Sequence, residues 1–349
     1  MKRPIATLIA TLALVMAVAQ EPAQGLTYSL PKTSLRIHLL IEKRQFTPGR
    51  LAAYAEKYMK LPCRLEPETT YSIVGVDIEA VGVPDTAHLY NVPLNKRHTI
   101  FRLEQAPGGM LTAVNASAQP TTPRRAFSPA PRPKPLNAAD YMDADVLAAA
   151  SSAKMAELIA QDVYDIREAR NQLTRGEADA MPADGAQLKL MMEGLNSQEE
   201  ALMQVFRGTT TADTTETTIA FTPELPGGRH LLFRLSRHLG LTDVDDLGGA
   251  PFYVNIDDEH TLASLPTSAQ TAQGKAADEA YLHVILPGRV KVTLTDEQGK
   301  ALLQRELYAA QFGRTEALSN DLFGKRQTCH IHLSPITGAI EDIVVEPLK

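Results

Sequence analysis

The stretch Leu35-Arg36-Ile37-His38-Leu39-Leu40-Ile41-Glu42 has an apolar residue at every odd position and mostly polar residues at the even positions. Side chains of a strand alternate between its two faces, so this pattern predicts a strand with one face buried in a core. Similar runs recur through residues 26–118, interrupted by a short helical pattern after Pro48. We therefore expect an N-terminal β-rich region with one short helix.

A second β-rich region is expected over residues 213–349. Eight runs there have the length and composition of strands: 217–222, 230–236, 252–256, 281–286, 290–295, 302–308, 328–333 and 340–345. The stretch 230–239 fits a short helix equally well. Many short strands at close spacing are typical of a β-sandwich or an open barrel.

Residues 138–212 carry a helical pattern instead. Apolar residues recur at helical spacing in two series, Met155, Leu158, Ile159, Val163, Ile166 and Leu173, then Leu188, Met191, Leu195, Leu202 and Phe206. Gly176 is suited to end the first helix and Asp184 to cap the second. The sequence thus predicts an α+β, mainly β fold: antiparallel β-sandwich or open-barrel regions with a long antiparallel helical hairpin inserted between them.

Residues 119–137 differ in character from both neighbours. Prolines alternate there with small residues and with basic ones such as Arg124 and Arg125. Repeated prolines remove backbone donors and favour an extended, solvated chain. We interpret this stretch as a linker, with a proline-rich recognition ligand as the alternative.

Residues 1–19 have the order of a secretory signal peptide. Lys2 and Arg3 precede an apolar run, and Ala17-Val18-Ala19 precedes Gln20. The run is shorter than a spanning helix needs, and no cysteine follows it to carry a lipid. We expect cleavage after Ala19 and a soluble periplasmic or secreted product without a membrane anchor.

Charge and composition narrow the classes of partner. Loss of Lys2 and Arg3 changes the formal net charge from −6 to −8, which argues against nucleic acid. The chain has no tryptophan, which weakens a carbohydrate-binding interpretation. Cys63 and Cys329 fit either one bridge closing a very long loop or two separate thiols.

Several short segments carry a family resemblance. They are Tyr28-Ser29-Leu30-Pro31-Lys32, Ile166-Arg167-Glu168-Ala169-Arg170, Pro182-Ala183-Asp184-Gly185, Gln311-Phe312-Gly313 and Ser334-Pro335-Ile336-Thr337-Gly338-Ala339-Ile340. With them, nearly the whole mature chain resembles a family of exported Bacteroidales proteins classed as a domain of unknown function. The resemblance implies an envelope or secreted setting, and it implies no activity and no functional residue.

His330 and His332 form the sharpest local candidate site. Two residues apart on a strand, they share one face, a spacing that metal sites use. A four-residue hairpin loop would place Glu341 opposite His332 as a third ligand. Cys329, Ile331 and Leu333 would then face the core. The alternative is an exposed pair with a cross-strand contact between histidine and glutamate.

Two acidic stretches are weaker candidates. Asp243–Gly248 gathers oxygen ligands as calcium loops do, but it lacks their distal glutamate, which favours a solvated turn. Asp257–His260 suggests a carboxylate pair, although adjacency in sequence does not place two carboxylates across a cleft. No nucleophile elbow, metalloprotease helix, phosphate loop or dinucleotide fingerprint occurs, and no cofactor is expected.

Three functions remain open at this point. The leading hypothesis is a non-enzymatic envelope protein that binds a protein or an envelope component through its helical hairpin. A metal-dependent hydrolase using His330 and His332 is the second. A glycan-binding module is the third.

Overall fold

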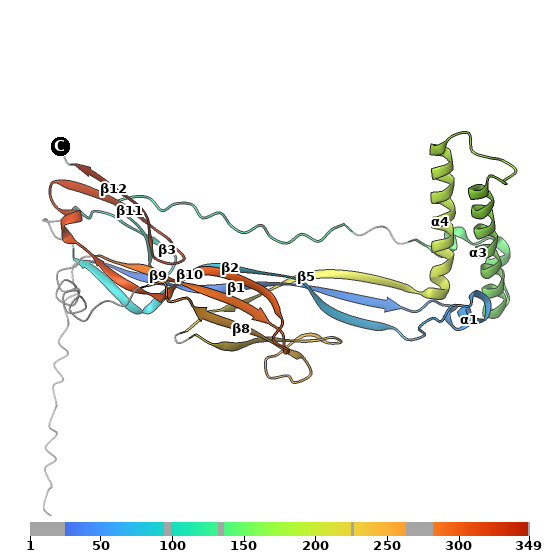
Figure 1. The fold of residues 1–349 in the computed structure, drawn as a ribbon, viewed down its shortest axis with the longest axis horizontal. Coiled ribbons are helices and arrows are strands. Elements are labelled where there is room, and N and C mark those ends of the chain that lie inside the picture. Colours follow the sequence, from blue (N-terminus) through green and yellow to red (C-terminus); the bar gives the residue numbers. More distant parts are fainter. Residues whose placement is uncertain (1–24, 94–98, 132–135, 225–226, 263–281, 348–349) are drawn as a thin grey trace, which may run out of the picture.

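The protein, described by a computed structural model over residues 25–93, 99–131, 136–224, 227–262 and 282–347, is elongated. Two β-sheets form a body at one end, and helices α1 to α4 form a helical end at the other (Figure 1). Long strands connect the two parts. The prediction of a mainly β chain that contains two consecutive long helices is confirmed.

Strand β1 (Gly25–Thr47) is the axis of the molecule. It pairs antiparallel with β2 (Glu68–Pro93) along almost its whole length. Its other side pairs with β5 (Thr209–Phe221) and, at Ser29, with β4 (Met110–Val114). Leu35, Ile37 and Leu39 are fully buried, as their alternation predicts. The strand is much longer than its alternating segment, because both neighbours continue its hydrogen bonding to the helical end.

Strands from both predicted β-rich regions share one sheet. Its order is β12 (Ile340–Pro347), β11 (Gln327–Leu333), β4, β1, β2, with β3 (Leu103–Ala106) on β4 and β5 on β1. The second sheet has the order β10 (Ala301–Leu318), β9 (Leu282–Thr295), β8 (Ala250–Asp258), β6 (Arg229–Ser236), β7 (Gly240–Thr242). A short 3-10 helix, η3 (Asn320–Phe323), precedes β11. The stretch 230–239, which fitted a strand or a helix, therefore contributes a strand.

The two sheets curl and bury apolar residues against each other. Odd residues of β1 and Ile78 of β2 pack with residues of β6, β8, β9 and β10 in one cluster. A second cluster gathers the ends of β1, β4, β9 and β11 with Phe323. Because both clusters draw on segments from the two ends of the sequence, neither β-rich region has a core of its own.

Strand β9 joins two runs that the sequence suggests are separate. Pro287 and Gly288 lie within it, opposite a bulge in β10 between Ala309 and Arg314. The backbone approaches closely there, since a Cβ on Gly288 would lie 2.0 Å from the carbonyl oxygen of Phe312. The bulge in β10 accommodates Pro287 and Gly288, so β9 continues through them as one strand instead of ending in a turn.

The described part of the helical end consists of two 3-10 helices and four α-helices. They are η1 (Ala52–Tyr54), α1 (Ala55–Met59), η2 (Ala138–Tyr141), α2 (Ala144–Leu147), α3 (Ser152–Arg175) and α4 (Gly185–Arg207). Gly176 ends α3 in the left-handed conformation, and the Asp184 side chain accepts a hydrogen bond from Gln187 N at 2.8 Å. Both helix boundaries agree with the sequence.

Residues 119–131, here called the strap, have neither helical nor strand structure. Figure 1 shows the chain running along the molecule here, from the body towards the helical end. The strap contacts the first sheet through Arg124, which pairs with Asp77 and Glu216. The strap is therefore a linker that also forms ion pairs with the first sheet.

The two cysteines are free thiols. Cys63 is half-buried beside the helical cluster, and Cys329 is buried in the body. Of the two alternatives left by the sequence, the structure has the separate thiols. The predicted signal peptide lies outside the described residues.

Candidate functional site at the helical end

The helical end has its own buried cluster. Leu51, Met59 and Val146 pack there against one face of α3 and the last turns of α4. The buried residues of α4 are Ala201, Leu202, Met203, Val205 and Phe206, all in its C-terminal half. No residue of this cluster belongs to either cluster of the body. The helices are thus held together independently of the sheets.

The N-terminal half of α4 is apolar and only partly covered. Five large apolar side chains lie in it, and none is buried: Leu188, Leu190, Met191, Met192 and Leu195. Leu190 is 70% exposed, and Met181, in the connection before the helix, is 49% exposed. Exposed apolar side chains gathered in one place mark interaction sites more often than scattered ones do, and methionine adapts to varied partner surfaces.

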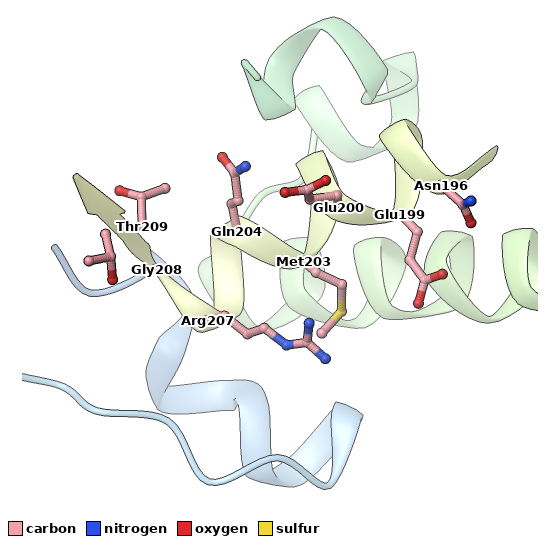
Figure 2. A pocket seen from close by; sticks show the side chains of 9 residues that line it. Asn196, Glu199, Glu200, Met203, Gln204, Arg207, Gly208 and Thr209 are labelled. Atoms are coloured by element: carbon pink, nitrogen blue, oxygen red, sulfur yellow. The ribbon is translucent and has the colours of Figure 1, made fainter. Parts of the chain in front are cut away.

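A polar hollow lies beside this surface. It has a volume of about 480 Å³ and is lined by α4 from Asn196 to Arg207 and by the first residues of β5. Figure 2 shows Glu200, Gln204 and Arg207 projecting from the helix around it. The hollow contains charged and amide groups next to the apolar half of α4, so this end of the molecule exposes both polar and apolar side chains.

Glu199 links α4 to α3 by hydrogen bonds. Its two carboxylate oxygens accept hydrogen bonds from Arg167 at 2.7 Å and from Arg170 at 2.6 Å. Burial by itself raises the pKa of Glu199, but the hydrogen bonds and charges of the two arginines outweigh burial and leave that pKa below its usual value. The carboxylate is therefore charged at neutral pH and acts structurally.

His330 and His332 lie on β11 with partly exposed side chains, while Cys329, Ile331 and Leu333 are buried, as expected. His330 Nδ1 is 2.7 Å from the carbonyl oxygen of Asn115. His332 Nδ1 is buried without a hydrogen-bond partner among the described residues. The two rings thus have different surroundings although they share a face.

The expected pairing of Glu341 with His332 is wrong. Ser334 N donates to Ala339 O at 2.8 Å, which closes the four-residue loop that we expected. A bulge follows between Leu333 and His332, so that His332 pairs with Asp342 and Glu341 becomes the extra residue. Within the described ranges, no three His, Cys, Asp or Glu side chains are placed to hold a metal ion. A metal site at His330, His332 and Glu341 stays a prediction.

Both acidic stretches use their carboxylates locally. Asp246 Oδ1 accepts a hydrogen bond from Gly248 N at 2.8 Å within the turn 243–248. Asp258 Oδ1 accepts one from His260 N at 2.8 Å, and Glu259 pairs with Arg289. These contacts agree with solvated turns and bring no carboxylate pair across a cleft.

A polar cluster that the sequence analysis did not predict lies beside the strap. His38 is almost fully buried, with Nε2 3.3 Å from Glu79 Oε2 and Nδ1 3.4 Å from Glu216 Oε1. A hollow of about 560 Å³ lies beside these residues. The signal available in the sequence was His38 itself, a polar residue inside the strongest strand pattern, but its partners come from β2 and β5.

The comparisons agree with this picture of one continuous unit. A family model described as a domain of unknown function (DUF4831) matches residues 24–341, which include the second sheet, the strap, the helical end and the first sheet except most of β12. The chain belongs to the DUF4831 family. The resemblance to a family of unknown function is thereby confirmed, while the bacterial order stays a prediction. No curated protein and no solved structure gave a significant match. None of the helices in the described part of this DUF4831 chain combines the length and hydrophobicity needed to span a bilayer.

Proposed function

We propose that this DUF4831 chain is an exported, soluble envelope protein that acts as a binding or assembly module rather than as an enzyme. Its helical end contacts a protein or another envelope component. The body serves as a spacer that holds the helical end away from the rest of the protein. The order of residues 1–19, which is that of a secretory signal, supports the placement outside the cytoplasm.

The observation that carries this proposal is the exposure of Leu190 and Met191 in the apolar N-terminal half of α4. Helices in a protein normally bury their apolar stripe, and α4 does so from Ala201 to Phe206. From Leu188 to Leu195 the stripe continues, but it is only partly covered within the described chain: Leu188, Met192 and Leu195 are half-buried, and Leu190 and Met191 are exposed. A partner that packs on this half would bury the side chains that the protein leaves exposed.

The connection between body and helical end supports the same role. Near the helices, β1 and β5 have exposed residues such as Arg44, Gln45 and Thr211. Strands exposed in this way form a narrow ribbon that extends the helical end beyond the second sheet (Figure 1). A protruding, independently packed unit is accessible to a large partner.

The test is a comparison of partners captured by three versions of the full mature chain. A Leu190→Ser, Met191→Ser double variant should lose the partner that the wild-type chain captures from envelope extracts. Leu247→Ser is the matched control, since Leu247 is 83% exposed but lies in a turn of the body. It should retain the partner. Equal capture by both variants contradicts the proposal, and circular dichroism verifies that α4 remains folded.

Export is tested separately. N-terminal sequencing of protein from its native cells should begin at Gln20, and fractionation should place it in the periplasm or the medium. A native chain that begins at Met1 contradicts export but not binding through the helical end.

A further inference from the structure

Arg124 of the strap binds to two carboxylates of the body, Asp77 on β2 and Glu216 on β5. This site is called the Arg124 seat. The Nη1 of Arg124 is 2.6 Å from Glu216 Oε1, and its Nε is 3.3 Å from Asp77 Oδ2. Glu216 Oε2 also accepts a hydrogen bond from Phe127 N at 3.4 Å. One guanidinium thus spans two carboxylates on the outer face of the first sheet. Charge-assisted pairs of this kind recognise arginine more specifically than lysine.

The seat is held in place without the strap. Asp77 Oδ1 lies 3.2 Å from Arg305, which also donates to the carbonyl oxygen of Ile78. Glu216 lies beside His38, and Thr218 Oγ1 is 3.1 Å from His38 Nδ1 on the same side. Groups of the sheet therefore keep both carboxylates positioned when Arg124 leaves, and a preorganised site loses less entropy on binding.

The strap itself has few other contacts. Within the described strap residues, its hydrogen bonds to the sheet come from Arg124 and from Phe127 N. None of these residues is buried, and the prolines supply no backbone donor. The neighbouring Arg125 is exposed. The Arg124 seat is consequently the main attachment of the strap.

The hollow beside the seat is large enough for more than one side chain. Its volume is about 560 Å³, and on the side of the body its walls combine Arg36, Met110 and Pro335 with the polar cluster of His38. Thr121, Thr122 and Pro123 of the strap lie along it. The strap thus follows this groove as an extended ligand follows a binding site.

We propose that this groove is a binding site for an arginine that is carried by an extended, proline-containing peptide, and that the strap is its resident ligand. Asp77 and Glu216 bind the guanidinium, and the residues next to it lie along the adjoining hollow. A segment of the same chemistry on a partner protein binds when it displaces the strap. This site is separate from the helical end and does not depend on the function proposed there.

A synthetic peptide with the sequence of residues 119–131 provides the probe. In the wild-type chain the tethered strap competes at a high effective concentration, so the labelled peptide should bind weakly. In the Arg124→Ala chain the seat is vacant, and the peptide should bind about tenfold more tightly or better. Arg125→Ala is the matched control, because it removes an equal charge from the strap but not from the seat, and it should behave as wild type.

Two further binding measurements test whether the peptide binds through its arginine and Glu216. A peptide with alanine in place of Arg124 should not bind the Arg124→Ala chain, and addition of Glu216→Gln to that chain should abolish binding of the original peptide. Binding that survives either change, or equal affinity for wild type and Arg124→Ala, overturns the proposal.

A second measurement needs no peptide. Trypsin cleaves after Arg125, and a strap released by Glu216→Gln should be cut several-fold faster than in the wild-type chain. An unchanged rate, with an unchanged melting temperature, also overturns the proposal.

Discussion

The body and the helical end bury their apolar surface in different ways. In the body, the Tyr28 hydroxyl accepts a hydrogen bond from His283 N at 2.7 Å and donates one to His283 O at 3.3 Å, across 255 residues of sequence. At the helical end, α3 and α4 are consecutive elements, and the N-terminal half of α4 is only partly covered. The body thus joins segments that are far apart in the sequence, whereas the helical end packs consecutive helices and leaves Leu190 and Met191 exposed.

Phe206→Ala should have the largest effect on this contrast. Phe206 is fully buried in the helical cluster, and loss of a buried phenylalanine costs about 3–5 kcal/mol of the free energy of unfolding. Hydrogen exchange should show α3 and α4 losing protection while β1 keeps it, because the clusters share no residue. Equal loss in β1 would show that the two parts unfold as one.

Leu39→Ala is the reciprocal change in the body. Leu39 is fully buried between the sheets, so its truncation should lower the free energy of unfolding by about 2–5 kcal/mol. Denaturant unfolding measures the total, and hydrogen exchange should place the loss in β1, β6 and β8. A loss confined to α3 and α4 would contradict the division into separate cores.

Tyr28→Phe tests how the body satisfies its polar groups. The change removes the hydroxyl that bonds the buried backbone of His283, and an unsatisfied buried group costs about 1–3 kcal/mol. Burial also raises the pKa of Tyr28 far above its usual value, so the hydroxyl stays protonated. Chemical denaturation should report the loss. The matched control is Tyr308→Phe, because Tyr308 is 56% exposed.

Glu199→Gln should have a smaller effect, at the helical end. It removes the charge that pairs with Arg167 and Arg170, and partly exposed pairs contribute roughly 1 kcal/mol or less each. Since the folded-state pKa of Glu199 lies below its usual value, its contribution is present above the usual pKa and is lost as the pH falls through the folded pKa. Acid titration of helix unfolding should lose this component in the variant.

Leu190→Ser should have the smallest effect on stability. An exposed residue changes the free energy of unfolding by about 0.5 kcal/mol at most, so the melting temperature should hardly move. Partner capture should nevertheless fall. A large loss of stability would show that Leu190 supports the fold and is not a free contact surface.

The helix boundaries were within reach of the sequence because they depend on local chemistry. Gly176 takes a left-handed conformation that suits glycine, and the Asp184 carboxylate reaches the backbone three residues later. The same holds for the alternation of Leu35, Ile37 and Leu39. Each of these signals concerns residues that lie within one or two turns or strand repeats of each other.

The candidate sites could not be predicted from such local signals. The loop after β11 was predicted with the correct length, yet a single bulge moved Glu341 out of register with His332. The seat of Arg124 could not be found at all, because Asp77 and Glu216 are 139 residues apart and meet through β1, which lies between their strands. One inserted residue, or one strand order, decides which side chains meet.

The sequence by itself determined the element types, the burial of alternate residues and the two long helices, since these follow from short-range periodicity and capping. The tertiary structure alone decided that strands from both β-rich regions share one sheet, that Arg124 of the strap binds to that sheet, and that the N-terminal half of α4 is only partly covered. Strand pairing brings together segments that lie far apart in the sequence. The surface that stays exposed depends on how all the other elements pack.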